Sequence, residues 1–145
     1  MASDMATARP TAPPTSLPPR PTAPHLQIWR WTITMASSIT HRATGVALYS
    51  GTIVLAIWVF AAAQGGETFA KVAGFLASPL GVFILAGYCW ALIFHTLNGL
   101  RHLYWDTGRG FDLKTATATA WATYAASVVL AAIVVFAGLS ARGAL

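Results

Sequence analysis

The composition of this 145-residue chain excludes an ordinary water-soluble fold. Hydrophobic residues make up 56% of the sequence and charged residues only 9%, whereas soluble domains carry about 25% charged residues. The net charge of +5 does not indicate nucleic-acid binding, because the basic residues stand singly between apolar stretches instead of forming a patch. One cysteine, Cys89, excludes a disulfide or a cysteine-based metal site within the chain.

Residues 1–24 differ in composition from the rest of the chain. They are rich in Pro, Thr, Ala and Ser and show no periodic apolar face. Proline fixes φ and removes a hydrogen-bond donor, so the sequence predicts an extended or disordered tail. This tail lacks the apolar core of a secretory signal, and Asp4 is atypical of a mitochondrial transit peptide. We therefore expect a bacterial rather than a mitochondrial protein.

Residues 25–145 are predicted to form one all-α transmembrane domain. Apolar runs at 43–64, 80–101 and 116–139 are each long enough to cross about 30 Å of hydrocarbon as a helix. Strands are excluded because an open strand edge in lipid leaves backbone groups unpaired. The half-apolar segment 26–41, with tryptophans suited to the headgroup region, predicts an interfacial helix that enters the membrane obliquely.

The basic residues predict the orientation of the spans. Seven lie on one side and two on the other: Arg9, Arg20, Arg30, Arg42, Arg101, Arg109 and Lys114 against Lys71 and Arg142. Basic residues are enriched in cytoplasmic loops. We therefore expect the N-terminus in the cytoplasm, or the matrix, and the C-terminus outside, which is the periplasm in a bacterium.

A first set of polar residues precedes and enters the first span. Trp31, Met35, Ser38, Arg42 and Gly45 are spaced by four, three, four and three residues, which predicts one helix face. A ring, a hydroxyl and a permanent cation suit a planar ligand with carbonyl oxygens. The alternative is an interfacial arginine that reaches lipid phosphates, with the serine as a packing residue.

A second set lies in the middle span, where His95, Asn98, Gly99 and His102 occur at i, i+3, i+4 and i+7. His95 is six residues, or about 9 Å along a helix, from Arg101. An imidazole at that depth needs a partner or a metal. The pattern predicts an axial haem ligand, a bare patch for the macrocycle, and Arg101 and His102 beside its propionates. The alternative is a histidine bonded to a carbonyl of a neighbouring helix.

The segment YWDTGRG, residues 104–110, follows this set. Asp106 is expected either to pair with Arg42 or Arg101 at the interface or to belong to a helix-terminating turn made by Gly108 and Gly110.

Three motifs resemble the cytochrome b556 subunit of succinate dehydrogenase, respiratory complex II. They are RPTAPHLQIW at 20–29, SSITHRATG at 37–45 and HTLNGLRHLYWDTG at 95–108, in the family's order. The resemblance covers about residues 20–140. One departure is Ala23, where the family often has Ser.

The resemblance implies roles for particular residues. His95 matches the axial ligand of haem b, and His102 matches the histidine near a propionate. His41 and Arg42 are implied at the same end of the haem site, beside the bare position at Gly99 that the residue pattern itself suggests. The quinone-binding residues that it implies are Ser38, Ile39, Arg42, Trp31, Met35 and Asp106.

The resemblance also implies the partners of the chain. The chain would be one membrane-anchor subunit of a succinate:quinone oxidoreductase in the bacterial cytoplasmic membrane. A flavoprotein, an iron–sulfur protein and a second small anchor subunit would be its partners, with ubiquinone as substrate and no nucleic acid. This chain has neither a GxGxxG motif nor a cysteine cluster, so it is not catalytic alone. The second haem ligand would come from the sister subunit.

Two functions of other classes compete with this interpretation. A haem-free structural anchor would use the same spans only to hold a soluble partner. A small transporter subunit would need polar residues along a path through several spans, and the third span offers no charged residue. We therefore rank the transporter last.

Overall fold

The computed structural model describes residues 28–143, and the tail predicted for residues 1–24 lies outside them. The chain divides into two units, of which the second is Trp31–Leu145. Its described part contains four helices, α1 to α4. Three of them are long and apolar enough to cross a membrane, which confirms the predicted all-α fold with three spans.

The first helix, α1, comprises Ile33–Gln64. It begins after Thr32, whose hydroxyl accepts a hydrogen bond from the amide of Met35 at 3.3 Å. The expected interfacial helix and the first span are therefore one continuous helix in the described chain. Trp31 precedes the cap, so the prediction that it shares a helix face with Ser38 is wrong.

A second helix, α2, comprises Gly66–Ala77 and was not predicted. At 12 residues it is too short to span a bilayer, so hydropathy gave no reason to expect it. Gly65 and Gly66 have φ values of 64° and 52°, which lets the chain turn sharply out of α1. Lys71 and Glu67 form an exposed ion pair at 2.7 Å on its surface.

The two remaining helices are α3, Pro79–Asp106, and α4, Leu113–Ala141. Gly108 and Gly110 in the connecting loop have φ values of 77° and 80°. Such values favour glycine, so the helix-terminating turn predicted for this segment is confirmed. Asp112 then caps the first turn of α4 with its carboxylate.

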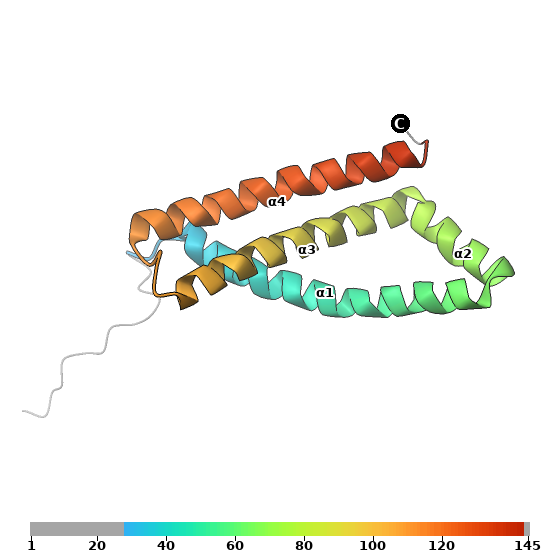
Figure 1. The fold of residues 1–145 in the computed structure, drawn as a ribbon, viewed down its shortest axis with the longest axis horizontal. Coiled ribbons are helices and arrows are strands. Elements are labelled where there is room, and N and C mark those ends of the chain that lie inside the picture. The colour runs from blue at the N-terminus through green and yellow to red at the C-terminus, as the bar shows by residue number, and fades with distance from the viewer. Residues whose placement is uncertain (1–27, 144–145) are drawn as a thin grey trace, which may run out of the picture. The chain divides into compact units, whose positions relative to one another are not determined.

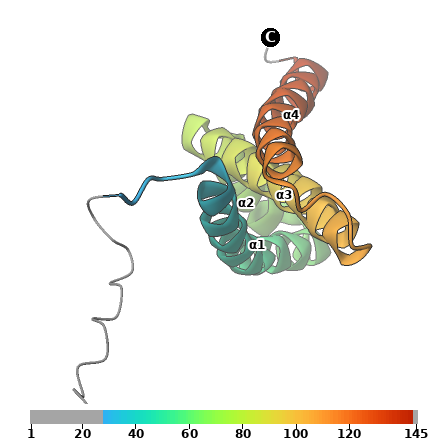
Figure 2. The same ribbon diagram turned by 90° about the vertical axis from the view of Figure 1, so that its left-hand side faces the viewer.

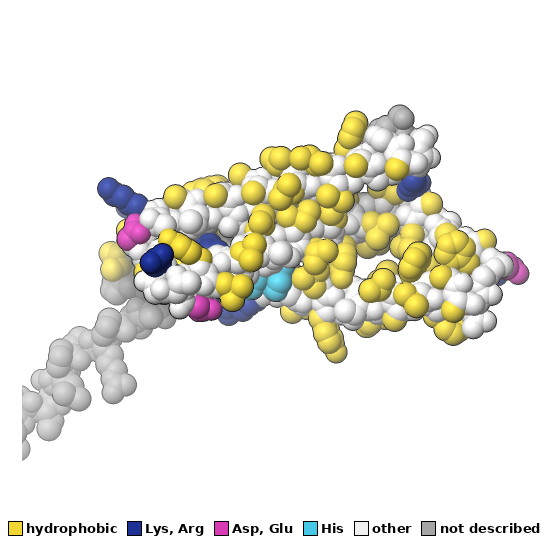
Figure 3. All heavy atoms as spheres, in the orientation of Figure 1, with side chains coloured by type: hydrophobic (Ala, Val, Ile, Leu, Met, Phe, Trp, Pro, Cys, Tyr) yellow, Lys and Arg dark blue, Asp and Glu magenta, His cyan; other side chains and the backbone are white. Residues whose placement is uncertain are grey.

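The helices pack with α3 in the middle (Figures 1 and 2), in contact with both α1 and α4. The buried apolar side chains are few and mostly small: Ala61, Ala91, Phe94, Ala120 and Ala131. Large apolar side chains lie on the outside along the helices, and the charged side chains visible in Figure 3 lie toward the helix ends. This arrangement suits lipid, which is as apolar as those side chains.

The two ends of this bundle differ. We call the end with the α3–α4 connection the loop end and the opposite end, where α2 lies, the α2 end. The polar side chains singled out in the sequence lie at the loop end of α1 and α3.

Candidate functional site

His95 lies in the part of α3 near the loop end and contacts α1. Its Nδ1 atom is 3.1 Å from the backbone oxygen of His41 and 3.1 Å from Oγ1 of Thr44. The ring of His41 stacks on the ring of His95, with 3.9 Å between the centroids and 10° between the planes. A Cβ atom on Gly45 would lie only 3.1 Å from Cε1 of His95. These contacts fix the position and the rotation of the His95 ring.

The second ring nitrogen of His95, Nε2, makes no hydrogen bond to any residue in the range 28–143. Gly99 lies one turn further along α3, and a Cβ atom there would meet nothing within 4 Å. The surface beside Gly99 is therefore open in the described chain.

His102 continues the same face of α3 and is exposed. Its ring centroid is 5.3 Å from that of His41 and 5.1 Å from that of Trp105. No group of three or more His, Cys, Asp or Glu side chains in the described chain is arranged to hold a metal ion.

Ser38 and Arg42 form a pair on the exposed surface of α1, where Nη2 of Arg42 donates to Oγ of Ser38 at 3.2 Å. Met35 and Ile39 lie beside them and are 37% and 48% exposed. A guanidinium has five N–H donors, and Arg42 makes no other hydrogen bond within residues 28–143. The remaining donors are free to bind the oxygen atoms of a ligand.

Two residues that the sequence analysis assigned to the quinone site, Trp31 and Asp106, lie outside the exposed surface of α1 that carries Ser38 and Arg42. Trp31 precedes α1 and is 58% exposed, and Asp106 is the last residue of α3. The expected ion pair of Asp106 with Arg42 or Arg101 is absent from the described chain, in which the only salt bridge is in α2.

Arg101 was expected beside the propionates on the histidine face, and this prediction is wrong. Its side chain points into the interior of the bundle, where it is only 7% exposed. Its Nη1 atom donates to Oγ of Ser37 at 3.3 Å and to Oδ1 of Asn98 at 3.4 Å. Ser37 also donates to Oδ1 of Asn98 at 2.8 Å, and both side chains are fully buried. We call Ser37, Asn98 and Arg101 the buried polar cluster.

The buried polar cluster extends to the third span. Nη2 of Arg101 donates to the backbone oxygen of Ala116 at 2.8 Å, and Nε donates to Oγ1 of Thr119 at 3.0 Å. The guanidinium also lies 4.1 Å above the ring of Trp105. Arg101 thus joins α1, α3 and α4 at the loop end. Polar residues at i and i+3 on an apolar helix were a usable signal for this cluster, although only the fold shows which helix they face.

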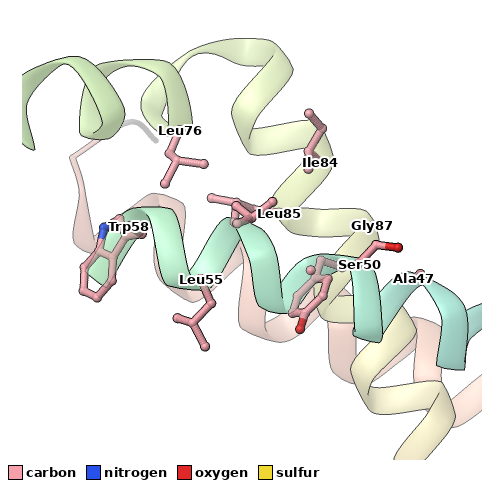
Figure 4. Close-up of a pocket in the computed structure, with 11 residues that line it drawn as sticks. Ala47, Ser50, Leu55, Trp58, Leu76, Ile84, Leu85 and Gly87 are labelled. Atoms are coloured by element: carbon pink, nitrogen blue, oxygen red, sulfur yellow. The ribbon is translucent and has the colours of Figure 1, made fainter. Parts of the chain in front are cut away.

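A cavity of about 530 Å³ lies between α1, α2 and α3 at the α2 end (Figure 4). Its wall is mainly apolar, with Leu55 and Trp58 from α1, Leu76 from α2, and Ile84 and Leu85 from α3. None of the described histidines, His41, His95 and His102, lines it. It is therefore separate from the histidine face at the loop end.

Fold and site together define an integral membrane protein with three spans that presents a fixed histidine and a serine–arginine pair at one end of its helices. The sequence profile of the succinate dehydrogenase/fumarate reductase transmembrane subunit family matches residues 16–134. The chain belongs to this family.

Individual relatives agree with this assignment. The succinate dehydrogenase cytochrome b556 subunit of Paracoccus denitrificans is 41% identical over 114 residues, which cover 79% of this chain and 88% of that protein. The subunit of the same name from Rickettsia bellii is 38% identical over 110 residues, covering 76% and 86%. The mitochondrial succinate dehydrogenase cytochrome b560 subunit of Sus scrofa is 35% identical over 100 residues, covering 68% and 59%.

Proposed function

We propose that this chain is the haem b-binding membrane-anchor subunit of a bacterial succinate:quinone oxidoreductase and forms part of its ubiquinone-reduction site. The observation that carries the proposal is the state of His95. Its ring is fixed by contacts with α1, Nδ1 is already bonded, and Nε2 is left for a metal. A metal-bound histidine ordinarily uses one ring nitrogen for the metal and the other for an orienting hydrogen bond.

The surroundings of His95 fit a haem. The open surface at Gly99 leaves room for the macrocycle, and His41, Arg42 and His102 lie toward the loop end, where they would meet the propionates. Haem b supplies one-electron chemistry at this site when it is bound.

The second axial ligand would come from a sister anchor subunit. His41 and His95 stack at 3.9 Å, which leaves no room for a haem between them. With His41 packed against His95 in this way, a histidine of the sister subunit would complete the site. A flavoprotein and an iron–sulfur protein would supply the electrons.

Ser38 and Arg42, with Met35 and Ile39 beside them, would hold the quinone ring at the loop end. Free donors of Arg42 would bind a carbonyl oxygen and stabilise the negative charge that develops as the ring is reduced. Trp31 and Asp106 would complete the pocket together with the partner subunits.

Ser38→Ala tests the quinone role, because Ser38 has no expected contact with haem. We expect normal assembly and a normal haem spectrum. Quinone reductase turnover should fall about 5- to 10-fold, equivalent to the loss of about one hydrogen bond of 1–1.4 kcal/mol. Succinate oxidation with an artificial acceptor that takes electrons upstream should stay unchanged. Both activities are measured on the purified complex.

The matched control is Ser50→Ala, at an exposed position of α1 nearer the α2 end, for which no change in either activity is expected. If Ser38→Ala leaves both activities unchanged across quinone concentrations, Ser38 is a packing residue and the pocket lies elsewhere.

The orientation of the chain gives a second test. The seven-to-two distribution of basic residues supports a cytoplasmic N-terminus. A reporter fused at residue 1 should therefore report a cytoplasmic location and one fused after Leu145 a periplasmic location. The opposite result would put Ser38 and Arg42 on the side of the membrane away from the soluble partners and would refute the proposed pocket.

A further inference from the structure

We infer that Thr44 is a positioning residue for His95, and that its hydroxyl, together with the carbonyl of His41, sets the midpoint potential of the haem. This inference rests on the proposed role of His95 as an axial ligand. The inference is based on two oxygen atoms of α1, Oγ1 of Thr44 and the backbone oxygen of His41, which both lie within hydrogen-bonding distance of Nδ1 of His95 in α3.

The carbonyl of His41 determines which nitrogen of His95 carries the proton. A backbone oxygen can only accept a hydrogen bond, and it lies 3.1 Å from Nδ1 of His95. Nδ1 must therefore carry the hydrogen. The neutral ring then has its free electron pair on Nε2, the atom that a metal requires.

The hydroxyl of Thr44 is a second acceptor for the same hydrogen. Its Oγ1 atom lies 2.9 Å from the backbone oxygens of both Thr40 and His41, so its own hydrogen is donated back to α1. A lone pair of Oγ1 is then left for Nδ1 of His95, 3.1 Å away. The Nδ1–H group thus makes a three-centre hydrogen bond.

Burial makes the Thr44 contact difficult to replace. Thr44 is only 4% exposed, so water has no ready access to the position of its hydroxyl. The stacked ring of His41 and the close approach at Gly45 hold the imidazole independently of this hydroxyl. Removing the hydroxyl should therefore change the electron density on the ring more than its orientation.

The expected direction follows from the charge on the iron. Atoms that accept a hydrogen bond from Nδ1–H raise the basicity of Nε2, the nitrogen that would bind the metal. A more basic ligand stabilises the oxidised iron more than the reduced iron and so lowers the midpoint potential. Losing one of the two acceptors should raise the midpoint potential by up to about 59 mV. For one electron this corresponds to about a tenfold change in the ratio of reduced to oxidised haem at a given potential.

The test is a redox titration of the purified complex, followed at the haem absorption band and by electron paramagnetic resonance of the oxidised haem. Thr44→Val keeps the side-chain volume and removes the hydroxyl. We expect normal haem content, a raised midpoint potential and shifted resonance positions. Thr44→Ser keeps the hydroxyl and should restore both values to those of the unmodified complex.

Thr44→Ala provides a second hydroxyl-free variant if Thr44→Val does not assemble, and it should shift the potential in the same direction. Unchanged potential and resonance positions in the hydroxyl-free variants, with haem still lost in His95→Ala, would overturn this inference alone. Haem bound normally in His95→Ala would overturn the proposed ligand role itself.

Discussion

Replacing His95 by alanine is expected to abolish the b-type absorption band of the purified complex or to perturb it strongly. The substitution removes a ring whose Nδ1 is held by the backbone oxygen of His41 and whose Nε2 is left without a partner among the described residues, one turn from the open surface at Gly99. A haem that keeps only the ligand from the sister subunit would lose its low-spin state or dissociate. The measurement is a reduced-minus-oxidised spectrum with a determination of haem content.

Thr96→Ala serves as the matched control on the same helix, because Thr96 is exposed and, within residues 28–143, bonds only to the backbone oxygen of Leu92 in its own helix. Its spectrum should equal that of the unmodified complex. A normal low-spin spectrum in purified His95→Ala would refute the ligand assignment. A complex that carries no b-type band even without substitution would instead identify the chain as a haem-free anchor.

Asn98→Leu is expected to destabilise the complex by about 2 kcal/mol or more. Its Oδ1 atom accepts hydrogen bonds from Ser37 and Arg101, and all three side chains are buried. Leucine would leave a buried hydroxyl and a buried guanidinium short of an acceptor, and such a loss costs about 1–3 kcal/mol, more where a charge is involved. The temperature at which the detergent-solubilised complex loses its subunits should fall.

Two further variants sharpen this experiment. Thr96→Leu introduces the same side chain on the exposed side of α3 and should leave the dissociation temperature unchanged. Arg101→Lys keeps the charge but has no planar fork, so it cannot hold Ala116, Thr119 and Asn98 at once and should also lower the temperature. If Asn98→Leu and Arg101→Lys are both as stable as the unmodified complex, the buried polar cluster does not hold the helices together.

The spans were predictable because hydropathy and length decide which segments can cross a bilayer. The helix ends were not, because a helix extends past the hydrocarbon for as long as its backbone stays paired. α1 therefore begins at Ile33, where Thr32 supplies a cap, rather than at residue 43. The 12-residue helix α2 was not predicted for a related reason: it is too short to cross the bilayer, so hydropathy gave no signal for it.

Within the site, the depth of His95 identified it as a residue that needs a partner, and the structure supplies one on Nδ1. The direction of Arg101 was not predictable in the same way. Position along a helix gives depth, but the helix that a side chain faces depends on how the helices pack. The structure turns Arg101 toward α4, where the backbone oxygen of Ala116 accepts from it.

The helices of the bundle are linked by side-chain hydrogen bonds at the loop end but are separated by a cavity at the α2 end. This difference affects how the chain responds to membranes of different thickness. A change in thickness alters helix tilt, and tilting makes packed helices slide along one another. At the loop end, side-chain hydrogen bonds tie α1 to α3 and α4, including Ser37–Asn98 and Thr40–Tyr124. At the α2 end, a cavity of about 530 Å³ separates α1 from α3. We therefore expect adjustment to the bilayer mainly between α1 and α3 at the α2 end, while the hydrogen bonds at the loop end keep α1 against α3 and α4.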